Sequence, residues 1–195
     1  MAVATEDRIV EAFLRLFRER GFEGITTRAV AEEAGVNEVT IFRRFGDKAT
    51  LAVRAVQRVM PASLLDAHEP RVDVSTPESA LAGITRSLLF IRDLLVGHPE
   101  VLRLALGEGM RTPAVSAAVA PTPLAAWRFL ERTLLQARPQ LRAEVDVHAA
   151  SLALQGLVFM TGLWSLHPDL RLQRREWDRL LQNAVRPLIR GGVAQ

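Results

Sequence analysis

Residues 26–51 read TTRAVAEEAGVNEVTIFRRFGDKATL, and this stretch decides the fold. Two helices that cross steeply over a short distance need a small side chain where their backbones approach, and Ala31 supplies it. Gly35 tolerates the positive φ that the turn between the helices requires. Ile41, with Phe45 one turn later, is placed to anchor the second helix in a core. The stretch therefore predicts a helix-turn-helix.

Capping residues mark where the helices of this region begin and end. Thr26 predicts the start of a helix over residues 27–34, Asn37 the start of the next, and Asp47 the start of a third. Upstream, Thr5 opens a helix whose apolar residues recur at helical spacing until it closes before Gly21. These signals predict a compact N-terminal module of short helices around the helix-turn-helix.

The wider stretch ERGFEGITTRAVAEEAGVNEVTIFRRFGDKATL, residues 19–51, resembles the signature of the tetracycline-repressor-like (TetR) family of transcriptional regulators. The resemblance is strong over about the first quarter of the chain, and beyond it rests on length and helical pattern. It implies a homodimer with two DNA-reading heads and an all-α C-terminal domain that binds a small ligand. Phe42 stands where the family often has Tyr, and Arg43 and Arg44 stand where His or a neutral residue is frequent.

The predicted DNA-contacting residues lie on the helix-turn-helix and at its edges. The second helix of the motif, from Asn37 to Phe45, is expected in the major groove, while Arg28 is placed to reach a guanine edge from the first helix. The phosphate-holding residues are expected to be Thr26, Thr27, Arg44 and Lys48. The full predicted set is Thr26, Thr27, Arg28, Asn37, Glu38, Val39, Thr40, Phe42, Arg43, Arg44 and Lys48.

The charge balance does not suggest a polycation. The isoelectric point is about 10.7, but the formal net charge of the 195 residues is only +3. With no Cys, no Tyr and Lys48 as the single lysine, few groups titrate between His and Arg, so a small excess of arginine raises the isoelectric point. General nucleic-acid affinity is therefore not implied, and an architectural DNA protein would fit a more basic chain.

Composition also bears on the compartment. The absence of cysteine excludes disulfides and thiolate metal sites. The N-terminus MAVATEDRI lacks the apolar segment of a signal peptide, so a cytoplasmic protein is expected. The longest apolar run, residues 149–164, contains polar residues and falls short of a membrane span, which predicts a buried helix and no membrane partner.

Helical signals continue to the end of the chain and strand signals are absent, which predicts an all-α protein. Further helices are expected from Asp47 toward Pro61, over residues 77–96, 99–107, 114–119, 123–137, 142–166 and 173–189, with a loop over 62–77 and a Pro187 kink in the last. The predicted domains are residues 1–50, the three-helix helix-turn-helix domain, and residues 51–195, a helical domain for ligand binding and dimerisation.

The last two long helices predict an assembly surface. Small side chains line one face of the first, and apolar residues recur with helical spacing along the second. Packing within one monomer is the plainer interpretation, but the family resemblance favours a four-helix interface between two copies. The predicted interface residues are Ala149, Ala153, Gly156, Met160, Trp177, Leu181, Ala184 and Leu188.

A ligand pocket is predicted from apolar residues on helices that surround a cavity in the resembled family. Their character favours an apolar or aromatic compound over one that carries phosphate. These residues are Phe90, Leu94, Leu102, Leu106, Met110, Trp127, Leu130, Phe159 and Trp164. His148 with Glu144 at i−4 could be half a metal site, but a surface interaction is the simpler interpretation, and no metal or cofactor is predicted.

These patterns lead to a ligand-responsive transcriptional regulator as the predicted function. The expected form is a repressor that binds a palindromic double-stranded operator as a homodimer and is released by a small apolar or aromatic effector. An activator of the same family is an alternative. A helical metal- or cofactor-dependent enzyme is another, although no catalytic residue can be assigned because no nucleophile or phosphate-loop motif is present.

Overall fold

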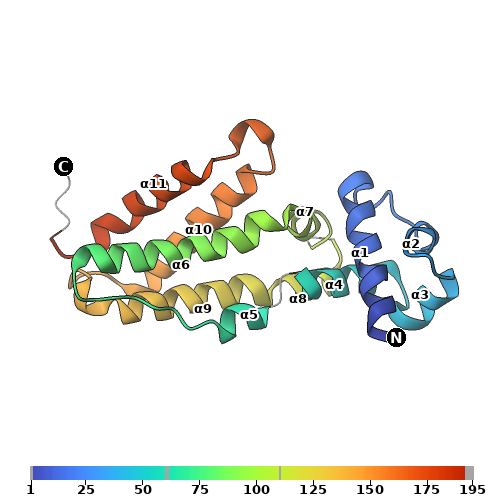
Figure 1. Ribbon diagram of the computed structural model, residues 1–195, viewed down its shortest axis with the longest axis horizontal. Helices are drawn as coiled ribbons and strands as arrows, with labels where there is room; N and C mark the ends of the chain where they lie inside the picture. Colours follow the sequence, from blue (N-terminus) through green and yellow to red (C-terminus); the bar gives the residue numbers. More distant parts are fainter. Residues whose placement is uncertain (1, 60–61, 110, 192–195) are drawn as a thin grey trace. The chain divides into compact units, whose positions relative to one another are not determined.

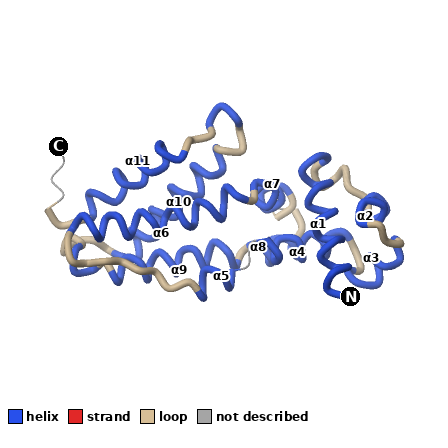
Figure 2. Tube along the Cα trace, in the orientation of Figure 1, coloured by secondary structure: helices blue, strands red, loops and turns tan. Residues whose placement is uncertain are grey.

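The computed structural model describes residues 2–59, 62–109 and 111–191, and these residues are helical apart from loops and one isolated bridge, Leu141 to Ile189. Figure 2 shows helices and connecting loops only in this part of the chain. The all-α prediction is therefore confirmed. The α-helices, labelled in Figure 1, are α1 (Ala2–Arg20), α2 (Thr27–Ala34), α3 (Glu38–Phe45), α4 (Lys48–Val59), α5 (Ala62–Ala67), α6 (Pro77–Gly97), α7 (Pro99–Gly107), α8 (Pro113–Val119), α9 (Pro121–Gln136), α10 (Val147–Trp164) and α11 (Arg174–Val185), with 3-10 turns at Arg138–Gln140, Pro168–Leu170 and Arg186–Leu188.

The chain forms two compact units. The first unit combines Met1–Pro61 with His98–Thr122, and the second combines Ala62–Gly97 with Pro123–Gln195. These units differ from the division expected after residue 50, because α4 packs against α1 and α8 and so belongs with the N-terminal helices. The assignment of DNA binding to one domain and ligand binding to the other stays a prediction.

The first unit is built on a core from all of its helices. Phe13 of α1, Ile41 of α3 and Leu51 of α4 are fully buried in it. Val101 of α7 and Val115 of α8 belong to the same core cluster, although they lie far along the chain from the other members. Burial of these side chains fixes α2 and α3 against α1 and α4, which leaves the opposite side of α3 free.

The second unit places α6 against α10 and α11. The Leu95 side chain of α6 packs directly over Gly162 of α10, so that a Cβ atom at Gly162 would collide with it. The indole of Trp177 on α11 is fully buried, with the Arg92 guanidinium 5.5 Å from its ring centroid. The loop expected over 62–77 contains the short helix α5, so that prediction is wrong over Ala62–Ala67.

Local capping explains where the last helices begin and end. Asp146 caps α10 by accepting a hydrogen bond from the Ala149 amide at 3.1 Å, so this helix begins later than the predicted residue 142. α11 ends at Val185 and passes into a 3-10 turn that contains Pro187. The α-helix predicted to continue to residue 189 with a kink at this proline therefore ends earlier, since proline removes a helical hydrogen bond.

Candidate nucleic-acid interface

The helix-turn-helix has the predicted geometry. Gly35 ends α2 with φ of 63°, in the left-handed region that favours glycine. Ala31 is almost fully buried where the two helices approach, and Ile41 and Phe45 anchor α3 in the core. These contacts hold α3 by one side, so its other side can meet a ligand as large as a nucleic acid.

The free side of α3 carries an apolar pair next to an arginine. The side chain of Val39 is 69% exposed and that of Phe42 is 50% exposed. Together with the exposed Arg43 they occupy positions i, i+3 and i+4, which lie on one face of a helix. Thr40 is half-buried at the edge of this face. The predicted base-facing residues of α3 thus include an outward apolar surface.

Several predicted contact residues already make local hydrogen bonds. The Thr26 hydroxyl accepts from the Ala29 amide at 3.1 Å and caps α2. The Asn37 side-chain oxygen accepts from the Val39 amide at 2.9 Å and caps α3. The Thr26 hydroxyl proton and the Asn37 amide nitrogen keep donor capacity for a phosphate.

One hydrogen bond joins the two helices of the motif. The Thr27 hydroxyl donates to the Glu38 carboxylate at 2.6 Å, across residues that lie eleven positions apart. This bond ties the start of α2 to the start of α3 and occupies one carboxylate oxygen. The main role of the Glu38 carboxylate in this structure is therefore to hold α2 and α3 together.

The charged side chains of this region separate into paired and unpaired groups. Glu32 pairs with Arg28 at 3.1 Å, and Glu33 pairs with Arg15 at 2.9 Å, both at exposed positions. Such surface pairs contribute little free energy, so Arg28 can leave Glu32 for a nucleic acid. Among the described residues, no hydrogen bond or ion pair engages the side chains of Arg43 and Arg44 on α3.

Lys48 makes contacts within the first unit that were not predicted from the sequence. Its ammonium donates to the backbone carbonyls of Phe22 at 2.9 Å and Ile25 at 3.2 Å, and lies 4.2 Å from the centroid of the Phe22 ring. The prediction that it mainly holds phosphate is therefore revised. Lys48 therefore ties the first turn of α4 to the loop before α2. Its half-buried ammonium donates charge-assisted hydrogen bonds to two carbonyls of that loop, which lie outside any helix.

Replacement of Lys48 by methionine is expected to lower the stability of the first unit by about 1–3 kcal/mol. Methionine keeps the apolar stem but removes both charge-assisted hydrogen bonds. Thermal unfolding should shift down by several degrees, while the slope of log affinity for duplex DNA against log salt should stay unchanged.

Arg44→Met is the matched control for Lys48→Met. Arg44 is exposed, so this variant should keep its melting temperature and lose about one unit of salt slope. An unchanged melting temperature for Lys48→Met, together with a reduced salt slope, would restore Lys48 to the phosphate contacts.

Asp47 caps α4 at the edge of the motif. Its carboxylate accepts from the Thr50 amide at 2.7 Å. The Thr50 backbone hydrogen bond, aided by the Thr50 hydroxyl, holds the pKa of Asp47 below its ordinary value of 3.8. A lowered carboxyl pKa stabilises the folded state above that value and loses this stabilisation as the pH falls through the folded-state pKa. The cap is therefore fully charged at neutral pH.

The predicted ligand residues are divided between the two units. Leu102 and Leu106 lie in the first unit. The other predicted ligand residues that the structure describes lie in the second unit. Met110 lies outside the described residues. Leu130 is fully buried, and Phe159 and Trp164 point outward as exposed side chains. The structure therefore does not bring the nine residues together within one unit.

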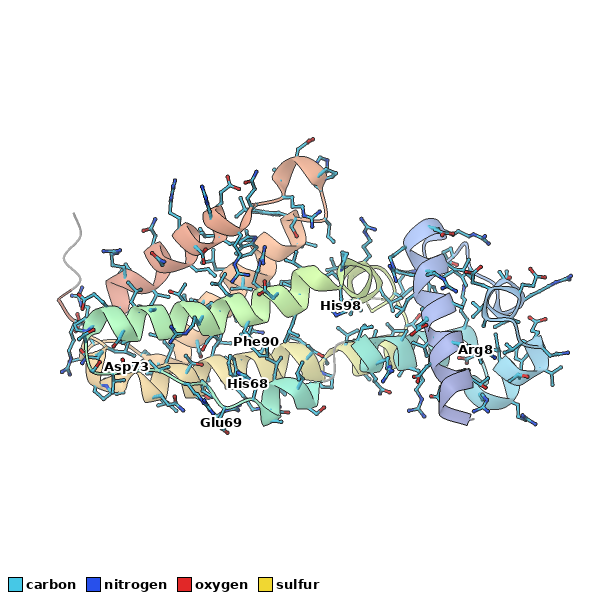
Figure 3. The ribbon with its side chains drawn as sticks, viewed as in Figure 1. Arg8, His68, Glu69, Asp73, Phe90 and His98 are labelled. Carbon is cyan, nitrogen blue, oxygen red and sulfur yellow. The ribbon has the colours of Figure 1, made fainter. Side chains whose placement is uncertain are left out.

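Two of the predicted ligand residues do belong to local clusters of the second unit. Phe90 stacks on His68 with ring centroids 4.5 Å apart, and Figure 3 shows the two side chains beside each other. The Trp127 indole donates to the Ser151 hydroxyl at 2.9 Å. Neither of the two cavities described in the first unit, of about 300 and 320 Å³, is lined by a predicted ligand residue.

The predicted interface residues of α10 share an exposed face. These residues are Ala149, Ala153, Gly156 and Met160. The bulky side chains of Leu152, Phe159 and Trp164 on the same helix are exposed as well. Together the seven residues form the α10 stripe, and their spacing of three and four residues is the signal that reveals it.

The interface prediction is wrong for two residues of α11. Trp177 and Leu181 are fully buried within the second unit, where α11 packs against α6. An amphipathic helix needs one covering surface, and α6 of the same chain supplies it. Ala184 and Leu188 are half-buried, and their place in an interface stays a prediction.

The exposure of α10 also changes the expectation of a buried helix. By length and composition alone, Val147–Trp164 could cross a membrane, but core helices of soluble proteins also have this length and composition. Only 28% of this helix is buried, which is less than expected for a core helix. His148 on this helix meets Glu131 of α9 at 3.2 Å rather than Glu144. Within the described part of the chain, no three or more His, Cys, Asp or Glu side chains form a metal-binding group.

Comparison with known proteins agrees with this geometry. The family described as bacterial regulatory proteins, tetR family, matches residues 9–55, all of them in the first unit. The transcriptional repressor NicS of Pseudomonas putida is 27% identical over 106 residues, which cover 54% of this chain and 49% of NicS. The uncharacterised HTH-type regulator YvkB of Bacillus subtilis is 43% identical over 111 residues, 57% of this chain and 53% of YvkB. The chain thus spans about half the length of these curated relatives.

Solved structures share the fold over nearly the whole chain. NalD of Pseudomonas aeruginosa, the secondary repressor of a multidrug efflux pump, superposes with a TM-score of 0.73 at 20% identity, covering 98% of this chain and all of NalD. The regulator FadR of Bacillus subtilis, solved with stearoyl-CoA, gives 0.71 at 15% identity, covering 96% of this chain and 98% of FadR. At these identities the likeness shows the fold.

Proposed function

Because the chain belongs to the tetR family of bacterial regulatory proteins, we propose that it is a transcriptional repressor that binds a palindromic DNA operator as a homodimer. The observation that carries this proposal is the free face of α3. The opposite face of this helix is buried in the core, and Asn37 caps the start of the helix. A helix held in this way fits the major groove, where its N-terminal residues meet base edges.

The contacts of the proposed complex follow from the charges on the first unit. Within the described residues, neither Arg43 nor Arg44 forms an ion pair with a carboxylate. Both can therefore bind phosphate without first breaking an ion pair. Arg28 can exchange the Glu32 carboxylate for a guanine edge or a phosphate. Thr26 and Asn37 can donate to phosphates from the helix starts that they cap.

Dimerisation is proposed through the α10 stripe. Apolar side chains exposed along a whole helix are unfavourable in water, and a partner that covers them removes this cost. The small residues Ala149, Ala153 and Gly156 allow a second helix to approach closely. A symmetric dimer places two copies of α3 on one duplex, so the operator should have two half-sites separated by about one helical turn or more.

An apolar or aromatic effector is proposed to bind the second unit and to release the operator. The chain passes between the two units three times, so a change in the second unit can reach the first through three connections. Repression is chosen over activation because NicS, a relative of this chain, is described as a repressor. The enzyme alternative is not carried further, since this family consists of regulatory proteins. The proposed target, bacterial DNA, implies a cytoplasmic location.

Selection of binding sites tests the proposed function. The purified protein is expected to enrich one palindromic sequence from a pool of random duplexes or genomic fragments. The variant Arg43→Ala with Arg44→Ala should enrich it far less, because both phosphate contacts are lost. Enrichment of no sequence above background would contradict the proposal.

A further inference from the structure

We propose that α3 recognises its operator chiefly through thymine methyl groups, so that each half-site places thymines opposite Val39 and Phe42. This inference rests on the proposed function and specifies which base feature the same surface reads. In the major groove the C5-methyl of thymine is the apolar feature that distinguishes one base pair from another. An apolar reading face therefore selects for it.

The exposed surface of α3 supports this assignment. Val39 and Phe42 are 69% and 50% exposed, on one face, on a helix of only eight residues. Neither side chain is needed for the core, which Ile41 and Phe45 serve from the opposite face. Two large apolar groups facing water on a short polar helix mark a surface that is covered in a complex.

The polar groups at the start of α3 are largely engaged in holding the motif. The Asn37 oxygen is bound to the Val39 amide, and a Glu38 oxygen is bound to the Thr27 hydroxyl at 2.6 Å. Breaking either bond to read a base would cost the cap or the link between α2 and α3. Direct polar reading is thereby restricted, and the apolar pair carries more of the selection.

Charge complementarity identifies the occupant of this apolar face as DNA. Arg43 lies beside Phe42 on the same face and Arg44 follows it, and neither is paired within the described residues. DNA carries anionic phosphates on either side of a groove that contains apolar methyl groups. It is therefore complementary to a helix face with an apolar pair flanked by arginines. The Phe42 ring is wide enough to meet methyl groups on successive base pairs, which lie about 3.4 Å apart.

Uracil substitution tests the inference without changing charge or base pairing. After the operator has been selected, each thymine of a half-site is replaced by deoxyuridine, which removes one methyl group. Affinity should fall about threefold to fourfold for each contacted thymine, as expected when the burial of one methyl group is lost. Thymines outside the half-sites provide the control on the DNA side.

Protein variants assign the contacts. In Val39→Ala and Phe42→Ala the affinity for the natural operator should fall, and the uracil penalty should disappear at the thymine that each residue contacts. Leu135→Ala, which removes an exposed side chain from α9, should keep the full uracil penalty. Both α3 side chains are exposed, so the variants should fold, and their circular dichroism melts check this directly.

The possible outcomes separate the inference from the proposed function. Specific operator binding that is insensitive to uracil, or a penalty that persists in both α3 variants, would overturn methyl reading and leave the repressor intact. A protein that selects no operator would remove the proposed function and this inference with it. Self-association that weakens in Phe42→Ala, with operator affinity unchanged, would instead assign the apolar face to a second copy of the chain.

Discussion

Replacement of Leu152 by glutamate is expected to convert the dimer into monomers and to weaken operator binding at least about 100-fold. Leu152 is 47% exposed in the first half of the α10 stripe, next to Ala153 and one turn before Gly156. In the proposed dimer a carboxylate at this position would be buried among apolar side chains, which costs several kcal/mol. Without the dimer each α3 binds a half-site alone, and the gain from simultaneous binding is lost.

Light scattering and operator titration measure the two effects in the same samples. The matched control is Leu135→Glu, which adds the same charge at an exposed leucine of α9 outside the stripe, and which should stay dimeric. A monomeric Leu152→Glu protein with full operator affinity would contradict the requirement for a dimer. A Leu152→Glu protein that remains dimeric would contradict the α10 stripe as the interface.

A saturating apolar effector is expected to lower operator affinity about 100-fold, which corresponds to a coupling free energy of about 2.7 kcal/mol. Only a ligand that binds the released conformation more tightly can shift the equilibrium in this way. By reciprocity, a saturating operator should weaken effector binding by the same factor.

Tryptophan fluorescence provides a measurement of effector binding that does not depend on DNA. Trp127 is half-buried and hydrogen-bonded to Ser151, whereas Trp177 is fully buried beside Arg92. A ligand near Trp127 should quench its emission saturably, and Trp127→Phe should abolish that change. Saturable quenching with unchanged operator affinity would show a binding site without a switch, and would contradict the proposed release.

The helix-turn-helix could be predicted closely because its determinants are local. Thr26, Asn37 and Asp47 cap their own helices through hydrogen bonds to amides two or three residues away. Gly35 occupies the left-handed conformation that its position in the turn demands. Interactions over such short distances leave a clear pattern in the sequence.

Long-range contacts account for the differences between the predictions and the structure. Lys48 binds carbonyls more than twenty residues before it, and no local pattern distinguishes this from a phosphate contact. Trp177 and Leu181 form an apolar stripe whose covering surface, α6, lies far away in the sequence. Periodicity shows that a helix face is covered but does not say by which partner.

The division of the chain into these two units could not be predicted from the sequence, for a related reason. Val101 and Val115 join the core around Phe13 and Ile41, although they follow α6 in the chain. A predicted boundary after residue 50 assumes that each domain is continuous in sequence. The predicted ligand residues consequently extend over both units, and their common pocket stays a prediction.

Fluorescence anisotropy with the selected palindrome and with a scrambled duplex of the same length and composition, at one fixed salt concentration, tests the proposed operator binding most directly. We expect the palindrome to bind roughly 1,000-fold or more tightly than the scrambled duplex, with protomers bound in multiples of two. Equal affinity for the two duplexes, or saturation at a single protomer for each palindrome, would contradict a dimeric repressor that reads DNA through α3.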